Sequence, residues 1–219
     1  MRGLKLLSVC TALAAAPTAG SPNTNTLDKL SALQAAGVTD PDASITKVTW
    51  NGRETIFVEY LADRSGLKGF DTVGWDEPPS QLVNNETGER DWQVRRLVAV
   101  QQGLDGKLQS ALVTDIQGDA WFADVAAIGF ANADKDRRDR ELIVIVEWDE
   151  HHGVGGGTDY QVRIFKQPDN SRSSFVALKG ISDRFGSEFE GRTFDTGERV
   201  YARFKTVGDV KRELKRLGY

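Results

Sequence analysis

Side chains that carry oxygen alternate along residues 132–136, between two apolar segments of the chain. Asn132, Asp134 and Asp136 occupy every second position, and Glu141 follows at the start of the apolar run LIVIV. Alternate oxygen ligands allow one tight turn to direct several carboxylates at a single cation, and a later glutamate can complete a shell of about six to eight oxygens. The spacing therefore predicts a calcium-binding loop.

The same loop resembles the calcium loops of integrin-type FG-GAP repeats and the related VCBS repeats, whose form is D-x-[DN]-x-D-G-x-x-[DE]-[LI]. Two positions depart from that form: Arg137 stands where glycine makes the turn, and Glu141 comes one residue late. The alternative is a solvated hairpin loop in which Asp and Arg side chains pair with one another. The resemblance implies as ligands the side chains of Asn132, Asp134, Asp136 and Glu141 and the backbone carbonyl of Arg138.

Both histidines of the chain lie in the segment DEHHGVGGGTDY, residues 149–160. Consecutive residues of a strand point to opposite faces, and the chain offers no further histidine and a single cysteine, so a zinc site is not favoured. The glycines lack the following helix and the Gly-Lys-Ser/Thr ending of a phosphate loop. Residues 149–158 are typical of a flexible hairpin tip, and the functional alternative is a recognition loop that orders on binding.

A second polar stretch, residues 62–91, is rich in Gly, Pro, Asn and acidic side chains and predicts a long surface excursion. Its Trp75 offers a ring for stacking on a partner, although a tryptophan beside strands is more commonly part of a core. We assign partner recognition to this excursion and to the hairpin tip. The candidate contact residues are Trp75, His151, His152, Gly155 and Gly156.

Catalytic motifs are scarce in this sequence. It has no G-x-S-x-G elbow and no HExxH helix, and its one cysteine, Cys10, lies near the N-terminus. Carboxylate pairs such as Asp76 and Glu77 leave glycoside hydrolysis open as an alternative function. The sequence therefore predicts a protein that is not an enzyme.

Residues 1–20 have the order of a secretory signal peptide, with a short basic start, the apolar run LLSVCTALAAA and a small-residue end at Gly20. Cleavage after Gly20 would leave residues 21–219 as a single mainly β domain, periplasmic or secreted. A lipoprotein acylated at Cys10 is the alternative. The apolar run is shorter than the ~20 residues of a spanning helix, so no membrane span is expected.

The charge balance is acidic, with 28 Lys and Arg against 32 Asp and Glu and a net charge of −4. Removal of Arg2 and Lys5 with the signal peptide makes the mature net charge −6. This balance argues against nucleic acid and against anionic lipid surfaces as main partners. Because the mature chain has no cysteine, its fold must rest on a core that is large enough without disulfides, or on a bound metal.

Periodicity predicts a helix at each end of the mature chain. Leucines recur at helical spacing between Thr26, a suitable N-cap, and Gly37, which supplies the left-handed residue after the end. Near the C-terminus, Thr206 and Asp209 resemble a capping box in front of an apolar stripe. Both helices are expected to pack on the core.

Strands are predicted between these helices. The segments ITKVTW and ETIFVEY flank Asn51-Gly52, the signature of a type I′ hairpin. LIVIV is continuously apolar, which predicts a central strand buried on both faces. LIVIV belongs to the predicted strand near residues 141–148, and the other strands are WQVRRLVAV, KLQSALVTDI and segments near residues 124–130 and 159–166. The predicted fold class is mainly β, an antiparallel sheet or a sandwich or partial-propeller-like domain, with a short N-terminal and a C-terminal helix.

The acidic loop, the LIVIV strand and the Gly-rich turn before YQVRIF are together similar to hairpins of small exported bacterial proteins that inhibit lysozyme-like cell-wall hydrolases, immunity proteins among them. This resemblance implies a binding protein, an inhibitor or immunity factor, with a basic cell-wall hydrolase as its partner. The acidic charge of the chain suits such a partner. A cell-wall or glycan hydrolase and a structural envelope domain are the alternatives.

Overall fold

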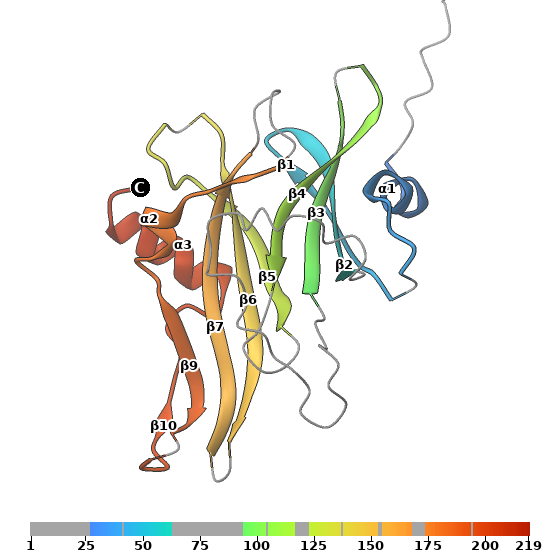
Figure 1. Ribbon diagram of the computed structural model, residues 1–219. Coiled ribbons are helices and arrows are strands. Elements are labelled where there is room, and N and C mark those ends of the chain that lie inside the picture. The colour runs from blue at the N-terminus through green and yellow to red at the C-terminus, as the bar shows by residue number, and fades with distance from the viewer. Residues whose placement is uncertain are drawn as a thin grey trace, which may run out of the picture.

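Helices stand at both ends of the described chain, and strands fill the part between them (Figure 1). The structure is a computed structural model that describes residues 27–40, 42–62, 94–103, 105–116, 123–136, 138–152, 155–167, 174–193 and 195–219. In chain order the elements are α1 (Lys29–Ala36), β1 (Ser44–Trp50), β2 (Arg53–Ala62), β3 (Val94–Gln102), β4 (Leu108–Ile116), β5 (Ala123–Ala131), β6 (Glu141–His152), β7 (Gly155–Lys166), β8 (Val176–Ala177), α2 (Lys179–Ser182), β9 (Ser187–Arg192), β10 (Arg199–Val200) and α3 (Val207–Arg216). The predicted mainly β class with a helix at each end is confirmed.

The strands form two antiparallel sheets that pack face to face. One sheet has the order β1-β2-β3-β4, and the other has the order β10-β9-β7-β6-β5 with β8 also paired to β7. Between the sheets lies an apolar core in which Trp50 stacks on Phe130 and on Phe175, at ring-centroid distances of 5.3 and 5.5 Å. The architecture is therefore the sandwich among the predicted arrangements.

The LIVIV segment lies in β6 with both faces buried, as its sequence predicts. Leu142 and Val144 pack in the core between the sheets, whereas Ile143 and Ile145 pack in a second core on the outer face of the same sheet. All four side chains are fully buried. Because β6 lies between β5 and β7, the prediction of a central strand is confirmed.

Helices cover the outer faces of both sheets, so that the layers run helix, sheet, sheet, helix (Figure 1). Ala32 of α1 packs in a cluster with Val98 of β3, and Val210 of α3 packs in the cluster that contains the outer face of β6. The second contact is close at Gly129 of β5, where an added Cβ would lie 2.3 Å from Val207 Cγ1. Gly129 therefore sets how near α3 can lie to its sheet.

Local side chains determine where the helices begin. Thr206 caps α3 as predicted, since its hydroxyl accepts a hydrogen bond from the Asp209 backbone N–H at 3.2 Å. The N-cap of α1 is Asp28, whose carboxylate accepts from the third N–H of the helix at 2.8 Å. This assignment corrects the prediction of Thr26, which lies outside the described residues.

The β1–β2 hairpin has the predicted turn. Asn51 and Gly52 have φ angles of 48° and 75°, and Trp50 pairs with Arg53 across them. Positive φ at both central residues is what a type I′ turn requires. The turn thereby fixes the register of two strands in the first sheet.

The structure corrects the sequence prediction for the Gly-rich segment. Residues 149–158 are predicted as a hairpin tip, but β6 and β7 stay paired as far as His152 and Gly155. An added Cβ at Gly157 would lie 2.6 Å from Phe189 Cζ, so the absence of a side chain there lets the Phe189 ring pack on the strand. The glycines therefore accommodate a neighbouring ring within a sheet.

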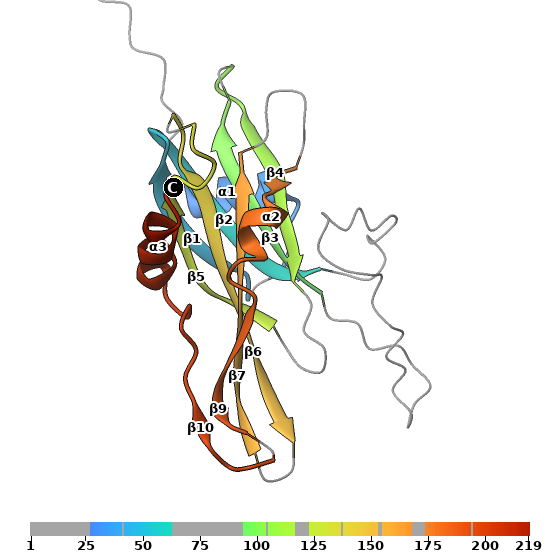
Figure 2. The same cartoon turned by 90° about the vertical axis from the view of Figure 1, so that its left-hand side faces the viewer.

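The outer parts of β6 and β7 continue past the first sheet, together with β9 and β10 (Figure 2). We call this projection the blade and define it as the described residues of 147–160 and 187–201. The elements α2, β8, β9 and β10 are absent from the sequence prediction, because a segment such as SEFEGR has a single apolar residue and no apolar alternation.

Two of the predicted segments cannot be compared with the structure. The signal segment and the surface excursion lie outside the described residues, apart from Ala62 at the end of β2. Among the residues that are described, no helix has the length and apolar character needed to span a membrane.

Candidate functional site

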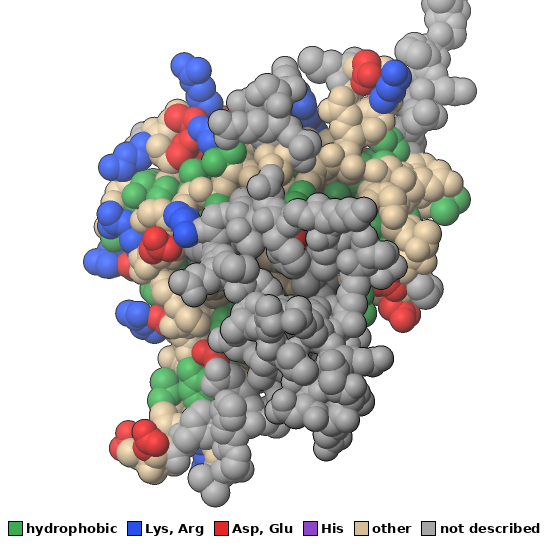
Figure 3. Space-filling view, viewed as in Figure 1, with side chains coloured by type: hydrophobic (Ala, Val, Ile, Leu, Met, Phe, Trp, Pro, Cys, Tyr) green, Lys and Arg blue, Asp and Glu red, His purple; other side chains and the backbone are tan. Residues whose placement is uncertain are grey.

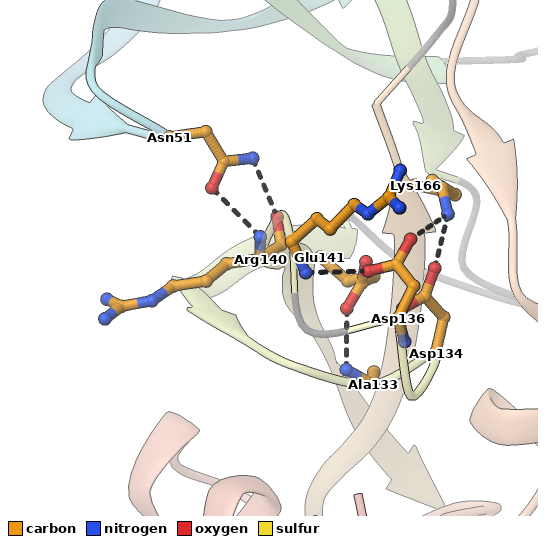
Figure 4. A network of polar contacts seen from close by, with 8 residues as sticks. Asn51, Ala133, Asp134, Asp136, Arg140, Glu141 and Lys166 are labelled. Atoms are coloured by element: carbon orange, nitrogen blue, oxygen red, sulfur yellow. Dashed lines mark hydrogen bonds and ion pairs between the residues drawn. The ribbon is translucent and has the colours of Figure 1, made fainter.

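The acidic loop joins β5 to β6 and is shaped by its own carboxylates (Figure 4). Asp134 Oδ1 accepts a hydrogen bond from the Asp136 backbone N–H at 3.0 Å, and Asp136 Oδ1 accepts from that of Arg138 at 3.1 Å. Lys135 between them has a left-handed φ of 70°. That conformation costs a non-glycine residue about 1 kcal/mol or more. Bonds from side chain to backbone thus hold the turn around Lys135, and Arg137, which stands at the glycine position of the FG-GAP pattern, lies outside the described residues.

Glu141 is the buried carboxylate of this loop. It is only 1% exposed, and its Oε2 accepts a hydrogen bond from the Ala133 backbone N–H at 2.6 Å. Burial raises the pKa of Glu141, the Ala133 hydrogen bond lowers it, and the nearby carboxylates of Asp134 and Asp136 raise it. A cation placed among these three carboxylates would favour the ionised form of Glu141.

The ammonium group of Lys166, at the end of β7, already lies against two of these carboxylates. Its Nζ contacts Asp134 Oδ2 and lies 2.9 Å from Asp136 Oδ2 (Figure 4). The hydrogen bond from Lys166 lowers the pKa of Asp136 to about 2, and the same two carboxylates raise the pKa of Lys166. The Lys166 ammonium of β7 therefore already serves as a cation at this loop.

The β1–β2 turn fastens the other side of the loop. The Asn51 amide accepts a hydrogen bond from the Arg140 backbone N–H at 2.9 Å and donates to the Arg140 carbonyl at 3.2 Å. Trp50 Nε1 donates to the same carbonyl at 2.7 Å. These three hydrogen bonds join the two sheets and hold the start of β6 in place.

The structure brings together part of the predicted ligand set. One ligand oxygen from each of Asp134, Asp136 and Glu141 lies within 4.8 Å of the others, which suits a single hard cation. Asn132 has an exposed side chain, and Arg138 contributes its backbone N–H to Asp136. The three carboxylates are able to hold a metal ion only after the Lys166 ammonium has moved away, because that group contacts two of the three.

Four of the five predicted partner-binding residues lie together in the structure. Gly155 and Gly156 pair with His152 and His151 at the end of the β6–β7 hairpin, within the blade. Gly156 also pairs with Arg192 of β9, so it is an interior position of the sheet rather than a free tip. The remaining predicted contact, Trp75, lies outside the described residues.

One face of the blade is acidic. Glu147, Tyr160 and Glu188 lie in register across β6, β7 and β9. Glu188 is paired with Arg203, whose Nε lies 2.6 Å from Glu188 Oε1. Burial raises the pKa of Glu147, and nearby carboxylates raise it further. Negative charge on this face is therefore only partly neutralised by the cations beside it.

The β9–β10 hairpin adds exposed apolar surface that sequence reasoning missed. Val200 is 38% exposed and Tyr201 is 62% exposed, and the Arg199 guanidinium lies 5.2 Å from the Tyr201 ring centroid. Asp195 and Glu198 in the same hairpin are exposed as well. The only sequence signal for this hairpin is the turn residue Gly197.

Sequence reasoning missed Lys166, the β7 residue that contacts the acidic loop. It follows the alternating segment YQVRIF and carries no pattern of its own, since only the pairing of β7 with β6 brings it to the loop.

No family model, no curated protein and no solved structure matches this chain. The resemblances to FG-GAP loops and to exported inhibitors stay predictions. The proposals that follow are argued from residues and geometry.

Proposed function

We propose that this protein is an exported binding protein and that the blade is the surface with which it contacts a protein partner. The observation that carries this proposal is the projection of β6, β7, β9 and β10 beyond the first sheet, with apolar and acidic side chains exposed near its end (Figures 2 and 3). A projecting hairpin can enter a cleft of another protein, whereas an enzyme needs a cleft of its own.

The chemistry of the blade favours a basic partner. Asp195 and Glu198 lie exposed beside the apolar Val200 and Tyr201, and Asp149 is exposed on the β6 side. Tyrosine is a residue type that commonly contributes much of an interface's binding energy. The exposed Arg192 and Arg199 offset part of the acidic charge in the blade, and the net charge of −4 of the whole chain would speed the encounter with a cation-rich protein at low salt.

The partner class that we propose is a cationic cell-wall hydrolase of the lysozyme type. Two arguments support it: the charge of the blade, and the sequence resemblance to exported inhibitor and immunity proteins. In this arrangement the hairpin tips would block the substrate cleft of the hydrolase. The protein itself would turn over no substrate.

The acidic loop has a supporting part in this proposal. It lies at the beginning of β6 and the blade at the end, so calcium bound to Asp134, Asp136 and Glu141 would stabilise the scaffold without touching the partner. Calcium would have to displace the Lys166 ammonium from two of those carboxylates. We therefore propose a stabilising metal that competes with an internal cation.

Calorimetric titration of the mature protein with a lysozyme-type hydrolase tests the proposal, together with an assay of cell-wall lysis. Tyr201→Ala should weaken binding at least tenfold, about 1.4 kcal/mol. The matched control is Leu30→Ala, which removes an equally exposed apolar side chain, 67% exposed, from α1 on the other sheet. It should leave binding and lysis unchanged.

Two outcomes would replace this proposal. If the purified protein cleaves peptidoglycan and a carboxylate substitution abolishes cleavage without unfolding the protein, the hydrolase alternative is correct. If the protein neither cleaves glycans nor binds any of a panel of cationic cell-wall hydrolases, the structural envelope alternative is favoured.

A further inference from the structure

The two long edges of the sandwich differ. At one edge the segment before β8 links the sheets, because Ser174 bridges to Leu112 of β4 and the Phe175 backbone N–H donates to the Leu112 carbonyl at 2.9 Å. At the other edge β1 and β5 are the last strands of their sheets. A cavity of about 320 Å³ lies between β5 and the first sheet, lined by Ser44, Thr46, Phe57, Glu59, Leu97, Val125, Ala126, Ala127 and Ile128.

A β-bulge in β5 shapes the wall of this cavity. The pairing of β5 with β6 shifts between Val125 and Ala127, so Ala126 is the extra residue and its side chain is exposed. The Val125 backbone N–H donates to Glu59 Oε1 at 3.2 Å, across to the other sheet. Bulges recur beside binding and active sites because they redirect backbone groups in this way.

Glu59 places a carboxyl group inside a cavity whose wall combines the hydroxyl groups of Ser44 and Thr46 with apolar side chains of β5. Its side chain is 12% exposed, and Arg95 Nη1 lies 3.7 Å from its Oε1. Arg95 is shared, since its Nε lies 2.6 Å from Asp124 Oδ1. Two carboxylates thus surround one guanidinium, and the local charge balance is negative. Burial raises the pKa of Glu59 and the Asp124 carboxylate raises it further, although the Val125 hydrogen bond and Arg95 lower it.

We propose that this cavity binds a small cationic amphiphile, a primary alkylamine whose ammonium group pairs with Glu59 and whose hydrocarbon chain contacts the half-buried Val125 and Ile128. The hydroxyl groups of Ser44 and Thr46 are available to accept the remaining N–H bonds of the ammonium. The cavity is at the lower end of the size range of ligand pockets and holds about ten non-hydrogen atoms at the ~30 Å³ that water occupies.

The charge of the site selects against other ligands of this size. Within the described part of the chain, an anion would face Glu59 and Asp124 with Arg95 to balance them. A neutral alcohol would gain the same apolar contact without the ion pair. This proposal is independent of the blade, because none of the cavity residues belongs to it.

Calorimetric titration of the mature protein with n-pentylamine near neutral pH, where the amine is charged, tests the inference. Pentanol and pentanoate are the matched ligands of equal length. We expect saturable binding of the amine that is at least tenfold tighter than that of pentanol, and no binding of pentanoate. Glu59→Gln, which keeps an acceptor for Val125, should weaken amine binding at least tenfold.

Two further variants separate the cavity from other causes. Ala126→Phe should fill the mouth of the cavity and weaken the binding of both amine and alcohol, since Ala126 is exposed at its rim. Glu54→Gln should change nothing, because Glu54 is a surface carboxylate of the same strand, paired with Lys47 at 2.9 Å. Equal amine affinity for the unmutated protein and for folded Glu59→Gln, or no saturable binding of the amine, would overturn the inference.

Discussion

Lys166 determines what the acidic loop can do. Its ammonium contacts Asp134 and Asp136, which are the same carboxylates that the FG-GAP resemblance assigns to calcium. An ammonium and a calcium ion cannot share these oxygens, because both need them within contact distance. Because Lys166 is 42% exposed, it has room to swing into solvent when a metal ion arrives.

Replacement of Lys166 by Met should therefore make the protein dependent on calcium. Without calcium the variant should melt at a lower temperature than the unmutated protein, because three carboxylates then lie together without a cation. With calcium at a hundredfold excess over its dissociation constant, binding to the native state should restore about 2.7 kcal/mol. Thermal melting in calcium and in EDTA measures both effects.

The companion variant is the double substitution Asp134→Ala and Asp136→Ala, which should lower the melting temperature more in calcium than in EDTA. Identical melting temperatures in calcium and EDTA for both the unmutated protein and Lys166→Met would reject calcium binding. The loop would then be held by Lys166 alone.

Glu147 gives the blade a pH dependence whose sign follows from its raised pKa. The folded state favours the protonated form of Glu147 more than the unfolded state does. This group therefore contributes stability below its unfolded pKa, and the contribution is lost as the pH rises through the folded pKa. Glu147→Gln should therefore raise the melting temperature at pH 7 and change little near pH 3. The gain should stay below about 1 kcal/mol, because solvent screens a half-buried group.

A control of opposite sign is available in α3. The hydrogen bond with Arg216 lowers the pKa of Glu213, so its stabilising contribution is present above the unfolded pKa and is lost as the pH falls. Glu213→Gln should lower the melting temperature at pH 7 and change little near pH 3. The prediction for Glu147 fails if Glu147→Gln lowers the melting temperature at pH 7 or leaves it unchanged.

At the scale of elements, α3 packs closely against β5 at Gly129 and Val207. This packing needs Gly129, because any Cβ there would meet the Val207 side chain. The Thr206 cap fixes where the helix begins. Its apolar residues Val210 and Leu214 complete the outer core.

Gly129→Ala should destabilise the protein by about 1–3 kcal/mol, the usual cost of an overfilled core. Adding Val207→Ala should recover part of that loss, since it removes the two methyl groups nearest to the new Cβ. A double-mutant cycle from chemical denaturation measures the coupling. Additive effects of the two substitutions would show that the clash is not between these side chains.

At the scale of the whole molecule, the two layers of sheet have different lengths. The second sheet is the longer one and supplies the blade, whereas the first sheet and α1 cover only its upper part (Figure 2). The acidic loop and the blade lie at opposite ends of β6, so stability and recognition are assigned to separate places. A variant at one end is expected to leave the other unchanged.

The N-terminal segment predicts that the whole chain is exported. The mature protein should begin at Ser21, after cleavage behind Gly20. Intact-mass spectrometry of protein recovered from the periplasm or the medium tests this. An acylated Cys10 would establish a lipoprotein, and an intact Met1 would show that the segment is not cleaved.

Features that depend on neighbouring residues could be predicted from the sequence. The Asn51-Gly52 turn, the buried LIVIV strand and the left-handed Gly37 follow from backbone preferences and apolar periodicity within a few residues. The acidic loop could be located in the same way, because its Asp side chains bond to backbone groups two residues away.

Features that depend on the order and register of strands were decided by the tertiary structure alone. Lys166 reaches Asp136 across 30 positions of sequence, and Asn51 reaches Arg140 across 89. The cavity around Glu59 lies where β1 and β5 are the end strands of their sheets. The blade exists because β6 and β7 extend beyond the strands of the first sheet (Figure 2). Such contacts are set by how the sheets pack, and no local pattern in the sequence encodes them.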